Sequence, residues 1–257
     1  MKTLLLIGIS LIVIACTTKW FTSSPNSEEP PLILASRAGD LNRVRELIKE
    51  GADVNQPGKF GGTPLFYAAG NDHVEVAAEL LEKGANIEAE DATGRTAIFA
   101  NLENERESVE MIKFLVSKGA SVNHIDKNGI NPLYVSVDIG GSYTKTQYLL
   151  EHGADVNHKT KENGDFPLEI ASSWDNLRTV ALLLENGADP NLQTSSGNSA
   201  LMEACRLNHK DIVALLLRKG ANPSLRNRKG QTALDVTPED ASEIRALLID
   251  LTSVNKH

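Results

Sequence analysis

The stretch that decides the fold runs from Gly62 to Asp91 and reads GTPLFYAAGNDHVEVAAELLEKGANIEAED. Thr63 can cap a helix start with its side chain, and Pro64 suits the first helical position, where its missing N–H costs nothing. A second helix is expected over Val74–Lys83, where apolar residues recur at helical spacing. Gly84 is suited to end that helix in a left-handed conformation. The stretch therefore predicts two short helices, followed by a polar, turn-rich segment that projects as a finger.

The same pattern returns along the chain with a nearly constant period. A Gly-Ala pair follows the second helix of each copy, at Gly51-Ala52, Gly84-Ala85, Gly119-Ala120, Gly153-Ala154, Gly187-Ala188 and Gly220-Ala221. Successive pairs lie 33 to 35 residues apart. Such a period indicates one supersecondary unit stacked many times, in which each unit contacts its neighbours. The sequence therefore predicts a solenoid with a long grooved surface rather than a globule around a single core.

Each unit also has a leading residue and a closing apolar pair. The leading residues are Pro31, Pro64, Ala97, Pro132, Pro167, Ala200 and Ala233. The closing pairs include Leu47-Ile48, Leu115-Val116, Leu149-Leu150, Leu183-Leu184 and Leu216-Leu217. The third and fourth units are longer, and their extra residues fall at 102–107 and 140–144, between the two helices. We expect these longer turns to widen the wall of the groove in the middle units.

Several of these motifs resemble ankyrin repeats. They are Thr63-Pro64-Leu65, the Gly-Ala-Asp-Val-Asn runs at 51–55 and 153–157, and Asn208-His209 before an apolar helix. The resemblance covers about residues 31–250. It implies an all-α ankyrin-repeat solenoid of about seven helix-turn-helix units with hairpin-like fingers, in a domain that we assign to residues 31–257.

One departure from the family pattern affects how the units are held together. The histidine that usually follows Thr-Pro-Leu is replaced in every unit, by Phe66, Phe99, Tyr134, Glu169 and Met202 among others. In the family, that histidine normally helps tie neighbouring units through hydrogen bonds. The resemblance therefore implies that apolar packing contributes more to the stack in this chain.

The terminal units have the polar residues that the ends of a stack need for solubility. Arg43, Arg45 and Glu46 make the first unit polar on its outside. The last unit carries Thr237-Pro238-Glu239-Asp240, which predicts a helix start with acidic residues near the positive end of the helix dipole.

The N-terminal residues resemble a bacterial secretory signal. Lys2 precedes an apolar run from Leu4 to Ala15, which is shorter than the about 20 residues that span a bilayer. Ala15-Cys16 is similar to the bacterial lipobox, in which the cysteine becomes the first mature residue and carries the lipid. The resemblance implies a signal peptide at residues 1–15 and a lipid on Cys16. A plain cleaved signal and an uncleaved anchor are the alternatives.

The residues after the signal predict a tether to the membrane. Residues 16–30 are rich in Ser, Thr and Pro, a composition typical of flexible linkers. In enteric-type bacterial lipoproteins, an Asp after the lipidated Cys tends to retain the protein in the inner membrane, and Thr17 stands there in this chain. The resemblance therefore implies a periplasm-facing lipoprotein, anchored to the outer membrane.

Composition and motifs argue against several classes of function. The net charge of −8 disfavours nucleic acid and anionic lipid surfaces as partners. With Cys16 lipidated, Cys205 has no partner for a disulfide. We find no zinc-protease helix, phosphate-binding Gly-rich loop or paired-cysteine metal motif, so we expect no enzyme, cofactor, metal or small-molecule substrate. Cys205 and His209 could share a helix face as a metal or thiol site, but a buried packing cysteine and a turn histidine explain them better.

The expected contact surface follows from how ankyrin stacks bind, through finger tips and the first helix of each unit. We also expect Glu103, Glu105 and Glu107 to form a solvated loop. Trp174 is the most suggestive contact, because aromatic residues and arginine dominate interface hot spots. The alternative is that Trp174 folds back onto the adjoining unit. Mapping the family's contact positions gives Phe60, Arg95, Ile130, Asp165 and Asn198 on the fingers, and Arg37, Asn71, Asp138, Ile139, Trp174, Arg206 and Leu207 on the helices.

The resemblance offers two kinds of protein partner. Some ankyrin lipoproteins similar to this chain neutralise lipase effectors of type VI secretion. The first hypothesis is therefore an immunity protein that occludes a secreted antibacterial toxin such as a phospholipase. The alternative is a scaffold that docks or stabilises a resident periplasmic enzyme such as a catalase. A third hypothesis is structural support of the envelope through several weak partners.

Overall fold

The computed structural model describes residues 29–104, 106–138 and 141–254, and this part of the chain is helical with no extended strand. The expected signal peptide, Cys16, the tether up to residue 28, Glu105 and Ile139 lie outside the described residues. Within them, no helix combines the length and apolarity needed to cross a bilayer. The helices are α2 (Pro31–Ala38), α3 (Leu41–Lys49), α4 (Pro64–Gly70), α5 (Val74–Glu82), α6 (Ala97–Leu102), α7 (Glu110–Ser117), α8 (Pro132–Val137), α9 (Tyr143–Glu151), α10 (Pro167–Ser173), α11 (Leu177–Glu185), α12 (Ala200–Arg206), α13 (Lys210–Arg218), α14 (Ala233–Val236) and α15 (Ser242–Val254).

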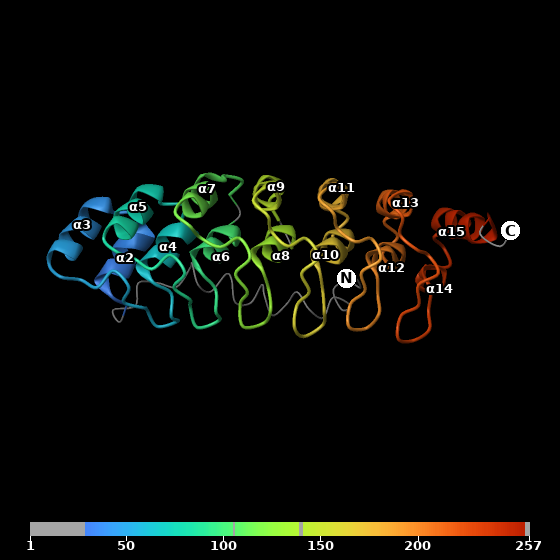
Figure 1. Ribbon diagram of the computed structural model, residues 1–257, viewed down its shortest axis with the longest axis horizontal. Coiled ribbons are helices and arrows are strands. Elements are labelled where there is room, and N and C mark those ends of the chain that lie inside the picture. Colours follow the sequence, from blue (N-terminus) through green and yellow to red (C-terminus); the bar gives the residue numbers. More distant parts are fainter. Residues whose placement is uncertain (1–28, 105, 139–140, 255–257) are drawn as a thin grey trace.

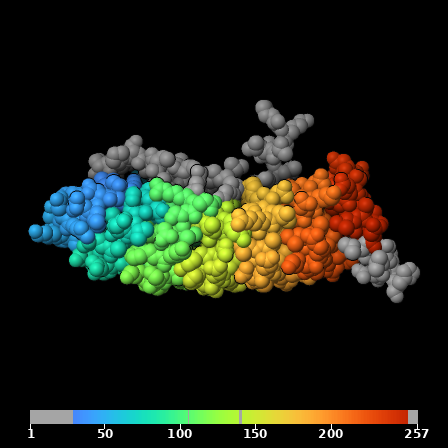
Figure 2. Space-filling view, turned by 90° about the horizontal axis from the view of Figure 1, so that it is seen from above, coloured from blue at the N-terminus to red at the C-terminus, as the bar shows by residue number. Residues whose placement is uncertain are grey.

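The helices form two rows that run along the molecule (Figure 1). Even-numbered helices make the inner row and odd-numbered helices from α3 onward make the outer row, with loops projecting away from the outer row. We call these loops the first to sixth fingers: residues 52–63, 85–96, 120–131, 154–166, 188–199 and 221–232. The described part contains seven helix pairs in an elongated body, with units following one another from end to end (Figure 2). The predicted all-α solenoid is confirmed.

The helices begin and end for the reasons that the sequence predicts. The Thr63 hydroxyl accepts a hydrogen bond from the Phe66 amide (3.3 Å), and Pro64 takes the first helical position of α4. α5 ends at Glu82, one residue before the predicted end, because Lys83 is its C-cap. Gly84 follows with φ of 90°, a left-handed conformation that glycine adopts without steric cost.

The core is a line of leucines between the two rows, with small residues along the inner helices. Ala68 and Ala69 of α4 are fully buried, which allows α6 to approach closely. The first leucine of the closing pair is fully buried in five consecutive units, at Leu80, Leu115, Leu149, Leu183 and Leu216. Burying such a side chain contributes roughly 1.5–3 kcal/mol, so this line is a major source of the stability of the stack.

Hydrogen bonds between units add to this packing more than the missing family histidine suggests. The Asn55 side-chain amide donates to the Gly84 carbonyl (3.1 Å), and its oxygen accepts from the Asn86 amide (2.7 Å). Asn123, Asn157 and Asn191 repeat both bonds at later junctions. We call these four residues the asparagine ladder. Between the second and third fingers, Glu88 stands where the other junctions have asparagine. Its carboxylate accepts from the Ser121 amide, but it cannot donate a hydrogen bond to the next unit as the asparagine amide does.

The last unit differs from the predicted helix start. α14 begins with a capping box, in which Thr232 and Asp235 exchange side-chain-to-backbone hydrogen bonds. Thr237 ends α14 and its hydroxyl donates to the Ala233 carbonyl (2.7 Å) instead of capping a new helix. α15 therefore begins at Ser242, five residues beyond the predicted cap.

Candidate protein-binding face

The inner helices and the bases of the fingers form one continuous surface, which we call the inner face (Figure 1). Backbone hydrogen bonds join each finger to the next near its tip. The donors and acceptors are Ala92 N to Phe60 O, Lys127 N to Thr93 O, Lys161 N to Asn128 O, Ser195 N to Asn163 O and Arg228 N to Ser196 O, at 2.7–3.2 Å. Because every finger is held by its neighbour, the inner face is a preformed surface.

The structure leaves several predicted contact residues accessible on this face. Phe60 is 44 % exposed at the first finger, with the Lys59 ammonium 5.9 Å from its ring centroid. Arg206 at the end of α12 is also exposed. Partly buried are Arg37, which stacks over Tyr67, and Asn71, Asp138, Trp174, Asn198 and Leu207.

Trp174 and Asp138 are brought together across two units. The indole Nε1 of Trp174 donates to the Asp138 carboxylate at 3.1 Å. Trp174 caps the C-terminus of α10 and is partly buried, and its bond to Asp138 holds the indole against the preceding unit, as the alternative interpretation expects. A fixed aromatic ring with a polar edge already oriented loses little conformational entropy on binding, which makes this pair a suitable contact point.

Arg95 is a structural residue rather than an open contact. Its side chain is 13 % exposed, it forms an ion pair with Glu103, and its Nε donates to Asp126 at 3.2 Å. The predicted solvated loop is therefore wrong for Glu103, whose side chain is 10 % exposed. Burial raises the pKa of Glu103, and the nearby Arg95 opposes that shift. Glu107 is exposed, as predicted.

Two other predicted finger contacts are inside the protein, and their expected place at the surface is wrong. Ile130 is 8 % exposed and packs in the core, and Asp165 is 6 % exposed. Asp165 lies near Glu169 and Glu203, whose charges act on one another. Burial, followed by the charges of Glu203 and Asp165, raises the pKa of Glu169 well above its usual value, and its Oε2 has no hydrogen-bond partner among the described residues. The spacing of apolar residues in the sequence does not indicate that an acidic side chain is buried.

Residues at the longer turn of the third unit tie three units together. Asn101 and Asn104 donate to the Ala69 and Gly70 carbonyls of the second unit, at 2.9 and 3.2 Å. Lys145 of the fourth unit is fully buried, and its ammonium donates to both asparagines at 2.8–3.2 Å. Burial lowers the pKa of Lys145 to about 8. These bonds form a cross-unit clamp, which we define as Asn101, Asn104 and Lys145. The widening of the wall by the two longer turns stays a prediction.

Cys205 and His209 do not form a site. Cys205 is buried with no accessible surface, and burial raises the pKa of its thiol to about 12, so it is unreactive. His209 Nδ1 lies 2.8 Å from the Ser172 carbonyl of the preceding unit. Over residues 29–104, 106–138 and 141–254, no group of three His, Cys, Asp or Glu side chains is placed to hold a metal ion.

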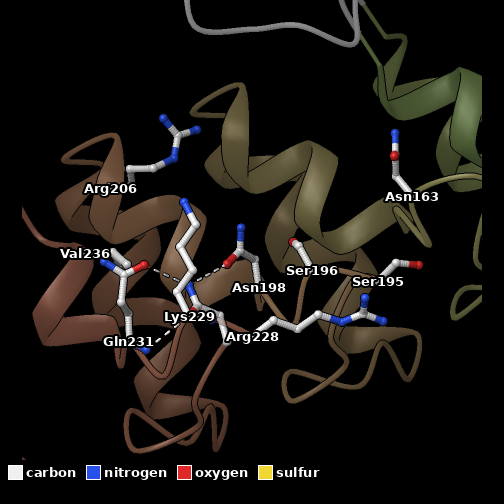
Figure 3. Close-up of a pocket in the computed structure, with 10 residues that line it drawn as sticks. Asn163, Ser195, Ser196, Asn198, Arg206, Arg228, Lys229, Gln231 and Val236 are labelled. Atoms are coloured by element: carbon white, nitrogen blue, oxygen red, sulfur yellow. Dashed lines mark hydrogen bonds between the residues drawn. The ribbon is translucent and has the colours of Figure 1, made fainter.

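Sequence reasoning missed a groove at the C-terminal end of the inner face (Figure 3). Its volume is about 480 Å³, and it lies between the last three fingers, α12 and α14. Lys229 rises between Arg206 and Asn198, while Arg228 extends along the finger tips toward Ser195 and Asn163. We call it the C-terminal groove, lined by Asn163, Ser195, Ser196, Asn198, Arg206, Asn227, Arg228, Lys229, Gln231 and Val236. The basic Arg-Asn-Arg-Lys run at 226–229 was the signal that could have indicated it.

Comparison with known families and structures supports the repeat architecture. A family model described as ankyrin repeats, in three copies, matches residues 11–91, 32–126, 89–160, 104–194 and 168–256. The ankyrin repeat domain of Bcl-3, a member of the IkappaB protein family, is similar with a TM-score of 0.75 and 28 % identity, over 87 % of this chain and 99 % of that one. The human ASB11 ankyrin repeat domain is similar with a TM-score of 0.73 and 26 % identity, over 86 % and 96 %.

Curated relatives share the repeats but are longer proteins. Human SH3 and multiple ankyrin repeat domains protein 2 is 32 % identical over 173 residues, which is 66 % of this chain and 9 % of the relative. The putative ankyrin repeat protein FPV031 of fowlpox virus (strain NVSL) is 31 % identical over 158 residues, 59 % of this chain and 46 % of the relative. The chain thus spans less than half the length of either relative.

Proposed function

The chain belongs to the ankyrin-repeat family, and we propose that it is a non-catalytic binding protein that holds one protein partner against its inner face. The observation that carries this proposal is the preformed inner face itself, in which bonded fingers and the fixed Trp174–Asp138 pair present polar and aromatic groups on a rigid stack. Rigid presentation favours affinity because little ordering entropy is lost when the partner docks.

We further propose that the protein acts at the bacterial envelope as an immunity protein. The support is the signal-like N-terminus and Cys16, which resembles a lipidated cysteine. A lipid-anchored binder facing the periplasm would meet a toxin such as a phospholipase where the toxin acts. The inner face would cover the active-site mouth or the membrane-docking surface of the toxin, so neutralisation would occur by occlusion and need no chemistry from this chain.

The test of the binding role uses the chain without its first 15 residues and with Cys16 replaced by serine. Candidate partners are the products of adjacent genes, each measured by calorimetry for a tight 1:1 complex. Trp174→Ala should weaken binding about tenfold, because truncated aromatic anchors commonly cost that much. Tyr148→Ala is the matched control, since Tyr148 lies on the outer helix α9, stacked on His152. Equal affinity for both variants would remove Trp174 from the contact surface.

The identity of the partner separates the two proposed roles. If expression of the lipid-anchored chain alone protects cells from the toxin of an adjacent gene, the immunity role is supported. A scaffold for a resident enzyme such as a catalase predicts instead that deletion lowers the level of that enzyme without a competing bacterium. Failure to bind or protect against any adjacent-gene toxin would overturn the immunity proposal.

A further inference from the structure

The C-terminal groove has an unusual charge balance for a protein with an excess of acidic residues. The described residues that line it include the cationic Arg206, Arg228 and Lys229 and no carboxylate. Arg206 is neutralised, because both its Nε and its Nη2 donate to Glu203, at 2.9 and 2.6 Å. Arg228 and Lys229 are exposed, and their side chains make no hydrogen bond or ion pair with a described residue. The groove therefore holds two uncompensated positive charges.

Most other basic residues of the fingers are engaged within the protein. The ammonium groups of Lys127 and Lys161 donate to the Ala92 and Lys127 carbonyls, at 2.8 and 3.3 Å. Lys159 donates to the Gln193 carbonyl, and Arg226 to the Gly230 carbonyl. Arg95 is buried between two carboxylates. Relative to these residues, Arg228 and Lys229 are placed to bind a group from outside.

The shape of the groove follows from short side chains in the fifth finger. Ser195 stands at the tip in the place that Lys127 and Lys161 take in the third and fourth fingers, and Ser196 takes the place of Asn128 and Asn163. The extended side chain of Arg228 lies beside these two serines in the view of Figure 3. The Arg228 backbone is fixed by its amide, which donates to the Ser196 carbonyl at 2.9 Å, so the guanidinium extends from an ordered base.

The floor of the groove is built from amides suited to a peptide backbone. Asn227 donates to the Asn198 side-chain oxygen at 3.0 Å, and Asn198 donates to Glu203 at 3.2 Å. Asn227 is fully used, because its amide also donates to Gln231 Oε1 at 3.2 Å and its oxygen accepts from the Lys229 and Gln231 backbone amides. Its bond orients the Asn198 amide, which keeps one donor and one lone pair for a group from outside, since a primary amide has two donors and two lone pairs. Cations at the rim and fixed amides on the floor match carboxylates carried on a polypeptide.

We propose that the C-terminal groove binds an acidic segment of the partner protein, with Arg228 and Lys229 pairing with Asp or Glu carboxylates. This inference rests on the proposed protein-binding role and specifies the chemistry of the partner at one end of the inner face. A protein segment is favoured over nucleic acid because the net charge of −8 repels a polyanion that extends beyond the groove.

The test measures fluorescence anisotropy of a labelled peptide of alternating Glu and Gly against the chain that lacks the first 15 residues. In about 20 mM salt, where screening is weak, the Glu-Gly peptide should bind, and a Gln-Gly peptide of the same length should not. Arg228→Gln with Lys229→Gln should weaken binding at least about tenfold, as expected for two lost charge-assisted pairs. Lys49→Gln with Lys219→Gln is the control, because it removes the same charge from exposed residues outside the groove.

The outcomes distinguish this inference from the proposed function. No binding of the Glu-Gly peptide, equal binding of the Gln-Gly peptide, or equal loss in the control variant would overturn the groove assignment, while the partner assay would still test the inner face. Tighter binding of a single-stranded oligonucleotide of equal charge would show that the groove takes phosphates instead. Thermal unfolding of both double variants at the wild-type temperature would confirm that altered binding is not a folding defect.

Discussion

The middle units and the last units of this stack use the same kinds of charged residue in opposite ways. In the second to fourth units, Arg95 and Lys145 are buried, and each is surrounded by acceptors from neighbouring units. In the last units, Arg228 and Lys229 project from a finger into an open groove. The difference teaches that, in a linear stack, a cationic side chain with acceptors on the next unit stabilises the contact between the two units. A cationic side chain without such acceptors is available to bind a partner.

The largest effect should come from exchanging one arginine in each region for glutamine. Arg95→Gln leaves Glu103 and Asp126 buried without their counter-ion, which should cost about 3 kcal/mol of unfolding free energy. Arg228→Gln should change stability by less than about 0.5 kcal/mol, because nothing within the described protein depends on its charge. Urea unfolding followed by circular dichroism gives both values. Similar losses for the two variants would break the comparison.

Lys145→Met should produce the next largest loss. It removes the ammonium donor that the carbonyls of Asn101 and Asn104 share in the cross-unit clamp, at a cost of about 2 kcal/mol. Lys113→Met on the exposed side of α7 is the control and should be nearly neutral. The unfolding midpoint in urea measures both, and a neutral Lys145→Met would show that the clamp does not hold the units.

The pKa of Lys145 gives this clamp a defined pH dependence. Its folded pKa of about 8 is below its usual value of 10.5, so the unfolded chain binds more protons between these two values. The contribution of this group to stability therefore rises as pH increases from 8 to 10.5. The difference in unfolding free energy between wild type and Lys145→Met, measured across this interval, should grow with pH. A constant difference would contradict the lowered pKa.

A smaller gain is expected from Glu169→Gln. The folded pKa of Glu169 is raised, so the folded state holds this proton more tightly, and the wild type loses stability as pH rises from 4.5 through the folded value. The substitution removes a buried like-charge contact and should stabilise by about 1 kcal/mol at neutral pH. Below pH 4.5 the gain should vanish. Thermal melts at both pH values test this, with Glu185→Gln on the exposed side of α11 as control.

The smallest effect concerns the inner face itself. Trp174→Phe keeps the aromatic ring but removes the donor to Asp138, and should cost about 0.5–1 kcal/mol of stability. Combining it with Asp138→Ala in a double-mutant cycle isolates the hydrogen bond between them. Additive effects of the two changes would show that the pair does not fix the indole.

The repeat architecture could be predicted because it depends on short-range patterns. The recurring Gly-Ala pair and the Thr-Pro start fix where helices begin and end, and both act within a few residues of the chain. The closing apolar pairs could be identified in the same way, and their first leucines are buried in the structure.

The contact surface was predicted less well because it depends on neighbours about one repeat away. Whether Arg95 is open or buried is decided by Asp126, which lies 31 residues further on, and by Glu103 in the adjacent turn. The groove around Arg228 likewise depends on the short serines of the preceding finger. A family template places such residues at a position but does not tell which of them are neutralised by the next unit.

The Glu88 junction has a consequence for how the molecule yields under load. There, the asparagine ladder lacks its donating half on the finger side, while the cross-unit clamp binds the same two units on the other side through Asn101 and Asn104. The second and third fingers remain joined there by the Lys127 amide, which donates to the Thr93 carbonyl, and by the ion pair between Arg95 and Asp126. We therefore expect tension along the rod to pass through that ion pair at this junction, so that in the Arg95→Gln variant these two fingers should separate first when the two ends are pulled apart.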